Sequence, residues 1–272
     1  MSVLASIKET VDFIRRSYQH ELEVGVILGS GLSSFSKEIS VELEIPYADI
    51  PHFPVSTVQG HSGKLIFGTI QGKKVVAMSG RFHYYEGYDP QTIVFPVRVM
   101  KFLGIKLLMI SNAAGGVNPD FNVGDLMIIR DHISFATPNP LVGANEDSLG
   151  ARFPDMSEPY KKNLIHLAKN AAQSLGIHIH EGVYFGVTGP TYETRAEYRM
   201  IHQMGGDAVG MSTVQEVIAA NHMGLPVFAM SVITDLGIRD DENVITHEEV
   251  LTAAKNAEPS FTAIFKAVIA SV

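Results

Sequence analysis

Short apolar runs that end in turns of small or polar residues recur along this chain, and helical patterns separate most of them. The clearest run is 24–28, which leads directly into Gly29-Ser30-Gly31. Such runs are typical of buried strands, and strands that alternate with helices predict an α/β fold around a parallel or mixed sheet. In these sheets ligands bind beyond the carboxyl ends of the strands. The six turns of this kind are Gly29-Ser30-Gly31, Ser79-Gly80-Arg81, Asn112-Ala113-Ala114-Gly115, Gly189-Pro190-Thr191, Gly210-Met211-Ser212 and Thr234-Asp235.

Hydrophobic periodicity predicts the remaining helices and strands, and nothing along the chain divides them into separate domains. Residues 65–70 and 75–78 flank Gln71-Gly72-Lys73 and predict a hairpin. The segment 137–159 is rich in Pro, Gly and Asn and is predicted to be a long functional loop. Since no linker interrupts the chain, residues 1–272 are predicted to form a single domain. The other predicted strands are 24–28, 106–111, 125–130, 183–187, 208–209 and 227–233, and the predicted helices are 3–18, 90–103, 163–175, 195–204, 214–223 and 247–269, the last with a proline at 259 that favours a break.

The composition argues against several classes of protein. The 21 Lys and Arg residues against 29 Asp and Glu residues give a net charge of −8, so binding to nucleic acid is not expected. The absence of cysteine excludes disulfides, thiolate nucleophiles and Cys-ligated metals. No apolar run approaches the ~18 residues of a membrane-spanning helix, and residues 1–16 lack the apolar core of a signal peptide. We therefore expect a soluble cytoplasmic protein without a membrane partner.

The segment 79–86 brings together more side chains that can bind an anion or transfer a proton than any other stretch of the sequence. Arg81 offers a permanently charged fork that suits a phosphate, and His83 can exchange a proton near neutral pH. Tyr85 adds a ring face and a hydroxyl, and Glu86 could orient the arginine or the histidine. At the end of a buried strand this group predicts an anion site beside a sugar or ring; the alternative is a surface arginine packed in an aromatic loop.

Other kinds of site have weaker support. Gly29-Ser30-Gly31 begins like a dinucleotide fingerprint, but the third glycine is missing and a hairpin follows instead of a crossover. The sequence has no P-loop lysine, no G-x-S-x-G elbow and no zinc-protease histidine pair, and no metal site is predicted. Glu193 follows a Gly-Pro turn and Asp235 ends the most apolar strand. Each carboxylate could recognise the N–H donors of a heterocycle or serve as a structural cap.

Taken together in order and spacing, five motifs resemble those of the trimeric purine nucleoside phosphorylases over essentially the whole chain. They are Gly29-Ser30-Gly31-Leu32, Gly80-Arg81-Phe82-His83-Tyr84-Tyr85-Glu86-Gly87-Tyr88, Asn112-Ala113-Ala114-Gly115-Gly116, Gly189-Pro190-Thr191-Tyr192-Glu193-Thr194 and Val209-Gly210-Met211-Ser212-Thr213. The resemblance implies one α/β domain with a distorted, partly barrel-like mixed sheet, assembled as a homotrimer. It implies reversible phosphorolysis of purine (deoxy)ribonucleosides to the free base and pentose 1-phosphate, with inorganic phosphate as co-substrate and no cofactor.

The resemblance also implies roles for individual residues. His83, Glu193 and Asp235 are expected to take part in catalysis. By motif, the implied phosphate ligands are Ser30, His61, Arg81, His83, Ala113 and Ser212; the implied ribose contacts are Tyr85, Met211, His247 and, from a neighbouring subunit, Phe153; and the implied base contacts are Ala114, Gly115, Tyr192, Glu193, Val209 and Asp235.

Asp235 departs from the pattern of the family members that take 6-oxopurines, which usually carry asparagine there. An ionised carboxylate only accepts hydrogen bonds, so it suits the 6-amino group of adenosine better than a 6-oxo oxygen. The related methylthioadenosine phosphorylases resemble this chain in having Asp, but Glu193 and His247 suit a 6-oxopurine and a free 5′-hydroxyl. We predict relaxed or adenosine-leaning base choice, with methylthioadenosine phosphorolysis, a non-catalytic nucleoside-binding module and, more distantly, a nicotinamide oxidoreductase as alternatives.

Overall fold

A mixed sheet lies at the centre of the computed structural model, which describes residues 2–55, 62–237 and 245–272. Within these residues the strand order is β2-β3-β4-β1-β5-β8-β7-β6-β9. Because β9 also pairs with β5, the strands β5, β8, β7, β6 and β9 close into a ring, from which β1, β4, β3 and β2 extend. The strands are β1 (Val24–Leu28), β2 (Ser40–Pro46), β3 (Lys64–Ile70), β4 (Lys73–Ser79), β5 (Leu107–Gly116), β6 (Leu126–Ile133), β7 (His180–Gly186), β8 (Ala208–Gly210) and β9 (Val227–Leu236).

Four neighbouring strands of this sheet run in the same direction. β4 is parallel to β1, β1 to β5, and β5 to β9. Their carboxyl ends therefore meet at one edge, which is where ligands bind in such sheets. The predicted α/β fold with a mixed, partly barrel-like sheet is confirmed.

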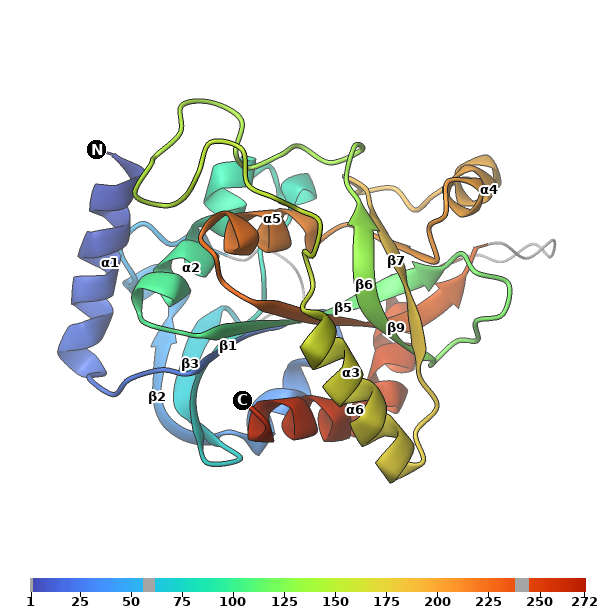
Figure 1. Cartoon of the computed structure of the whole chain (residues 1–272), viewed down its shortest axis with the longest axis horizontal. Coiled ribbons are helices and arrows are strands. Elements are labelled where there is room, and N and C mark those ends of the chain that lie inside the picture. Colours follow the sequence, from blue (N-terminus) through green and yellow to red (C-terminus); the bar gives the residue numbers. More distant parts are fainter. Residues whose placement is uncertain (1, 56–61, 238–244) are drawn as a thin grey trace.

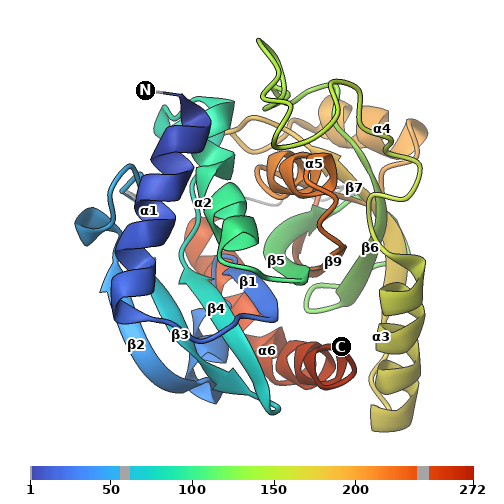
Figure 2. The same ribbon diagram turned by 60° about the vertical axis from the view of Figure 1, so that its left-hand side comes forward.

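Helices cover both faces of the sheet (Figure 1). α1 packs on α2 and α2 on α5 on one side, while α3 packs on α6 on the other (Figures 1 and 2). The long loop that leads from β6 to α3 runs beside α5 and has no helix or strand, as predicted. The helices are α1 (Val3–Ser17), α2 (Pro90–Phe102), α3 (Lys162–Leu175), α4 (Arg195–Gln203), α5 (Val214–His222) and α6 (His247–Ala270).

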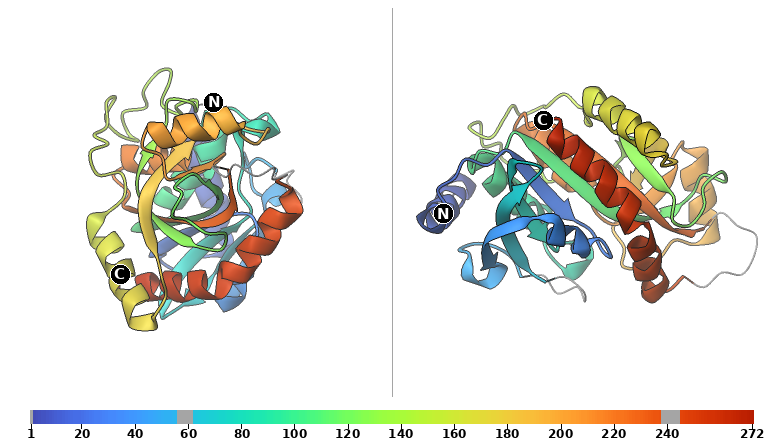
Figure 3. Two further views of the ribbon diagram at one scale, coloured as in Figure 1. Left: turned by 90° about the vertical axis from the view of Figure 1, so that its right-hand side faces the viewer. Right: turned by 90° about the horizontal axis from the view of Figure 1, so that it is seen from below.

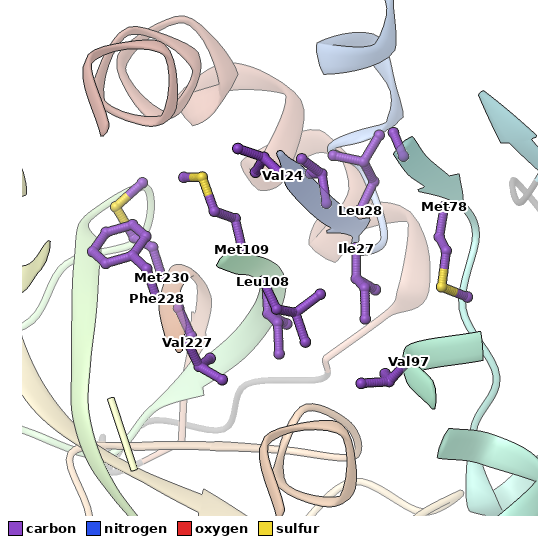
Figure 4. Close-up of a cluster of buried hydrophobic side chains, with 14 of the residues drawn as sticks. Val24, Ile27, Leu28, Met78, Val97, Leu108, Met109, Val227, Phe228 and Met230 are labelled. Carbon is purple, nitrogen blue, oxygen red and sulfur yellow. The ribbon is translucent and has the colours of Figure 1, made fainter. Parts of the chain in front are cut away.

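The core lies where the parallel strands meet the helices. Ile27 of β1, Leu108 of β5 and Val227 of β9 lie on the same side of the strands, with Val97 of α2 nearby (Figure 4). All four side chains are fully or almost fully buried. Every residue of β1 and of β9 is buried, which explains why β1 is a continuous apolar run and why β9 is mostly apolar without a regular polar alternation.

Three elements differ from the sequence-based prediction. β2 was not predicted, because its residues are mostly exposed and their pattern is polar. β5 continues through Asn112-Ala113-Ala114-Gly115-Gly116, which we predicted to be a turn, because β9 pairs alongside it as far as Gly116↔Leu236. α6 remains one helix with Pro259 inside it, and it bends along its length (Figure 3) rather than breaking. No helix in the described part of the chain is long and apolar enough to cross a membrane.

Candidate active site

One pocket at the carboxyl ends of the parallel strands gathers nearly all the residues predicted for the site. Ser30 follows β1, Arg81 follows β4, and Asp235 lies near the end of β9. The predicted residues that line this pocket are Ser30, Arg81, His83, Tyr85, Ala113, Ala114, Gly115, Tyr192, Glu193, Val209, Met211, Ser212, Asp235 and His247.

The guanidinium of Arg81 is held by a buried carboxylate that the sequence analysis missed. Its Nε donates to Oε1 of Glu216 at 3.1 Å and its Nη2 to Oε2 at 2.6 Å, while both side chains are at most 4% exposed. Nη1 donates to the carbonyl of Ser111 at 2.8 Å and to Oγ of Ser212 at 3.1 Å. This two-point pair fixes the plane of the guanidinium at the edge of the pocket.

His83 is oriented by the acid three residues further along the chain. Its Nδ1 lies 2.9 Å from Oε1 of Glu86, and the same oxygen accepts from the backbone N–H of His83 at 2.8 Å. Burial lowers the pKa of His83, although the hydrogen bond to Glu86 opposes the shift. A neutral imidazole with its proton on Nδ1 fits this contact, and its Nε2 is then an acceptor. The ring of Tyr85 stacks on the imidazole with centroids 4.6 Å apart.

The turn between β8 and α5 places Met211 and Ser212 in the pocket. The next residue, Thr213, has a φ of 72°, which is rare for a β-branched side chain. Its Oγ1 accepts from Nδ2 of Asn112 at 2.8 Å, so β5 holds the turn in place. Backbone strain of this kind is typical of functional sites, and here it lies next to a predicted phosphate ligand.

Two carboxylates and a phenol form the opposite end of the pocket. Oδ1 of Asp235 accepts from the hydroxyl of Thr234 at 3.1 Å, and Oδ2 accepts from the hydroxyl of Tyr198 at 3.4 Å. Burial raises the pKa of Asp235 and the charge of Glu249 adds to the shift, whereas the two hydroxyls oppose it. Burial also raises the pKa of Glu193. Each side chain is therefore easier to protonate than an exposed carboxylate.

Comparison with known proteins shows the same family along nearly the whole chain. The family model described as "Phosphorylase superfamily" matches residues 23–270. Purine nucleoside phosphorylase 1 of Geobacillus stearothermophilus is 50% identical over 264 residues, which cover 97% of this chain and 96% of that protein. Purine nucleoside phosphorylase of Rattus norvegicus is 46% identical over 257 residues, covering 92% and 89%. The chain belongs to the phosphorylase superfamily and, within it, to the purine nucleoside phosphorylases.

Solved structures of this family share the fold over the full length. Schistosoma mansoni purine nucleoside phosphorylase in complex with adenosine superposes with a TM-score of 0.95 at 41% identity, covering 100% of this chain and 99% of that one. A schistosoma purine nucleoside phosphorylase in complex with hypoxanthine gives the same values. The resemblance inferred from the five motifs is confirmed.

Two residues expected from the purine nucleoside phosphorylase motifs are not among the described residues that line this pocket, for different reasons. His61 lies outside the described residues. Phe153 is 87% exposed on the long loop and lines a separate shallow hollow, with the guanidinium of Arg152 5.6 Å from its ring centroid.

The sequence analysis also missed residues that the pocket contains. Tyr198 shares the buried face of α4 with Ile201, so the sequence shows only an apolar period there. Glu216 had a detectable signal, because it is a single acid among the buried apolar residues of α5. Pocket-lining residues that were not predicted as ligands are Asn112, Tyr198, Gly210, Thr234 and Val250. Among the described residues, no group of three or more His, Asp or Glu side chains could hold a metal ion.

Proposed function

We propose that this protein catalyses the reversible phosphorolysis of purine (deoxy)ribonucleosides to the free base and (deoxy)ribose 1-phosphate. The observation that carries this is one pocket lined by an anchored arginine, by the buried carboxylate of Asp235 and by the half-buried carboxylate of Glu193. An anion fits beside the arginine and a heterocycle with N–H groups beside the carboxylates, with space for a sugar between them. The relatives are named for the same activity.

The family motifs divide the pocket into three parts. Arg81, which Glu216 holds in place, is central to the phosphate part, and His247 at the start of α6 serves the 5′-hydroxyl. The proposed phosphate ligands are Ser30, His61, Arg81, His83, Ala113 and Ser212; the proposed ribose contacts are Tyr85, Met211 and His247; and the proposed base contacts are Ala114, Gly115, Tyr192, Glu193, Val209 and Asp235. Residues 1–272 act as one domain in this proposal, and its location is the cytoplasm expected from the sequence.

The reaction needs positioning and charge stabilisation rather than a cofactor. As the glycosidic bond stretches, the sugar becomes an oxocarbenium-like cation and the leaving purine gains negative charge. Phosphate held by Arg81 attacks the anomeric carbon from the opposite face. Holding both substrates in line can contribute ~7–11 kcal/mol, and a hydrogen-bond donor near the imidazole ring of the purine stabilises the charge that develops there.

Base choice is proposed to be relaxed towards 6-aminopurines. An ionised Asp235 could accept from the 6-amino group of adenosine and from a protonated N7. To bind the 6-oxo oxygen of a 6-oxopurine, the carboxyl group of Asp235 must be protonated. Its raised pKa lowers the free energy that this protonation costs. Glu193 suits the N1–H of a 6-oxopurine. Methylthioadenosine phosphorolysis is the second candidate because of Asp235, but His247 in the pocket favours a free 5′-hydroxyl.

A substrate panel tests the activity and the base choice together. With phosphate, we expect cleavage of adenosine and inosine at kcat/KM values within about tenfold of each other, because either base finds partners in the pocket. Methylthioadenosine should be at least ~10-fold slower, since its thioether cannot bond to His247. Chromatography of the products with and without phosphate measures all of this. Cleavage without phosphate would indicate hydrolysis, and untouched adenosine would refute the role of Asp235.

We also propose a homotrimer in which Phe153 covers the ribose bound by a neighbouring subunit. Exposed Phe153, Phe135 and Val142 gather on or beside the loop between β6 and α3, at 87%, 65% and 71% exposure. Such a group of apolar side chains is typical of a surface that another chain covers.

Mixing two variants with impaired activity tests this arrangement. Phe153→Ala should lower kcat/KM by roughly 10- to 100-fold because water reaches the sugar. Arg81→Met subunits lack phosphate binding but keep Phe153. If subunits share sites, refolding the two variants together should restore part of the activity, and light scattering should give three times the 29.6 kDa chain mass. Val142→Ala is the matched exposed control; a monomer, or mixtures without recovery, would contradict the proposal.

A further inference from the structure

The hydroxyl of Tyr198 lies between the two carboxylates of the base pocket. It reaches Oδ2 of Asp235 at 3.4 Å, and it also forms a hydrogen bond with Glu193. The three side chains line the same pocket, one from β9, one from α4 and one from the segment before α4. A phenol has one proton, so it donates to only one of these carboxylates at a time.

Close packing fixes the phenol and Asp235 in this arrangement. A Cβ at Gly237 would lie 2.1 Å from ring carbons of Tyr198, so the chain after β9 runs directly across the ring. A Cβ at Gly115 would lie 2.9 Å from Oδ2 of Asp235 and 3.4 Å from the hydroxyl of Tyr198. Only glycine leaves room at either position, and the Tyr198 side chain is 2% exposed. The phenol therefore cannot turn away from the carboxylates.

The other titratable groups around the two carboxylates include two further acids, a tyrosine and a histidine. Glu249 of α6 acts on Asp235, and Glu197 of α4 acts on Glu193. Tyr192 interacts with both carboxylates, and His247 lines the pocket from the start of α6. Two ionised carboxylates this close to one phenol repel each other, and negative neighbours add to that cost.

We propose that Asp235 and Glu193 hold a single proton between them when a purine is bound, and that Tyr198 donates to whichever of the two is ionised. This inference rests on the proposed function and explains how one pocket accepts both 6-oxopurines and 6-aminopurines. A proton shared within such a pair belongs to the pair rather than to either residue. The bound base decides which carboxylate carries it.

The hydrogen bonds of the two base classes match the two positions of the proton. A 6-oxopurine has a donor at N1 and an acceptor at O6, so it needs Glu193 ionised and Asp235 protonated. A 6-aminopurine has an acceptor at N1 and a donor at the amino group, so it needs Glu193 protonated and Asp235 ionised. Both complexes contain the same number of protons.

Tyr198 has a positioning role in this arrangement. Its O–H has two positions in the plane of the ring, and these allow it to face either neighbour. With a 6-oxopurine it donates to Glu193, and with a 6-aminopurine it donates to Asp235. The remaining charge thus keeps a charge-assisted hydrogen bond in both complexes, which is stronger than a neutral one.

Proton counting by calorimetry tests the proposal. Adenosine and inosine are titrated without phosphate, in two buffers that differ in ionisation enthalpy. For the unmodified protein at alkaline pH we expect both nucleosides to take up the same number of protons, about one each. In Asp235→Asn, binding of inosine should no longer be accompanied by proton uptake, whereas binding of adenosine still should be. In Glu193→Gln we expect the reverse. The proposal would be overturned if inosine bound to the unmodified protein without taking up a proton. It would also be overturned if the two variants gave equal proton counts for both nucleosides.

Removal of the phenol tests the part played by Tyr198. Tyr198→Phe should weaken the binding of adenosine and of inosine by a similar factor, about tenfold, because the ionised carboxylate loses its hydrogen-bond donor. For the same reason, the pH below which binding is lost should move to a higher value for both nucleosides. Tyr18→Phe is the matched control: Tyr18 also donates to a carboxylate, that of Glu42 at 3.0 Å, but lies outside the pocket. If the binding of only one nucleoside were weakened, Tyr198 would not donate to both carboxylates in turn and the proposed role would be refuted.

The assays separate this inference from the proposed function. Absence of phosphate-dependent cleavage in the substrate panel would refute phosphorolysis, whereas the proton counts come from binding alone. If Tyr198→Phe does not fold, the counts for Asp235→Asn and Glu193→Gln still decide whether the proton is shared.

Discussion

Arg81→Met is expected to lower kcat/KM for phosphate by about 10²- to 10³-fold, the scale seen when a donor to a developing or bound oxyanion is removed. Among the described residues that line the pocket, the guanidinium is the permanently positive group, and the Glu216 pair fixes its plane there. Methionine has a similar length but no charge and no donor. Steady-state kinetics with phosphate as the varied substrate measures the effect, and KM for phosphate should rise most.

The control for this prediction is Arg130→Met, which removes an exposed arginine from β6 and should leave kcat/KM unchanged. Arg81→Met also removes the guanidinium that pairs with the buried carboxylate of Glu216. Circular dichroism must therefore show that the variant is folded at the assay temperature. A folded Arg81→Met protein with near-normal kinetics would contradict the placement of phosphate beside this residue.

Glu216→Leu is expected to lower the free energy of unfolding by about 3–5 kcal/mol, the cost of leaving a buried charge unpaired. The two carboxylate oxygens accept from Arg81 at 3.1 and 2.6 Å, and the carboxylate side chain is 4% exposed. Leucine fits the apolar surroundings of α5, so the loss measures the arginine left behind rather than a cavity. Urea unfolding followed by circular dichroism measures the change.

The double variant Arg81→Met/Glu216→Leu separates stability from function. It should regain most of the lost stability, because no uncompensated charge remains in the buried site. It should stay as inactive as Arg81→Met alone. If the effects of the two substitutions on stability simply add, the buried pair does not couple the two residues.

The sequence predicted the elements whose signals are local. β1 was predicted with its observed bounds, Val24–Leu28, because all five residues are buried and apolar. α3 was predicted within one residue, since its buried positions repeat at helical spacing and Gly176, with a φ of 66°, ends it. Ser30, Arg81 and Asp235 were expected at one site because they follow predicted strands and the ends of parallel strands converge. The roles of the other predicted pocket residues came from the resemblance to the family motifs.

The sequence did not predict which distant segments pair with one another as strands. Residues 112–116 looked like a turn because they are small, yet β9 extends them as a strand into the site. The ring of β5, β8, β7, β6 and β9 depends on strands that are far apart in sequence. The polar strand β2 lacked the apolar period on which the prediction relied.

By itself the sequence determined the α/β class, the family and most side chains of the pocket, because periodicity and motif spacing are local properties. Only the tertiary structure decided that Glu216 pairs with Arg81 and fixes its plane, and that Tyr198 lies between Asp235 and Glu193. Both contacts join residues on separate elements, and Arg81 and Glu216 are 135 positions apart in the chain. Their strength comes from burial, which only the folded chain creates.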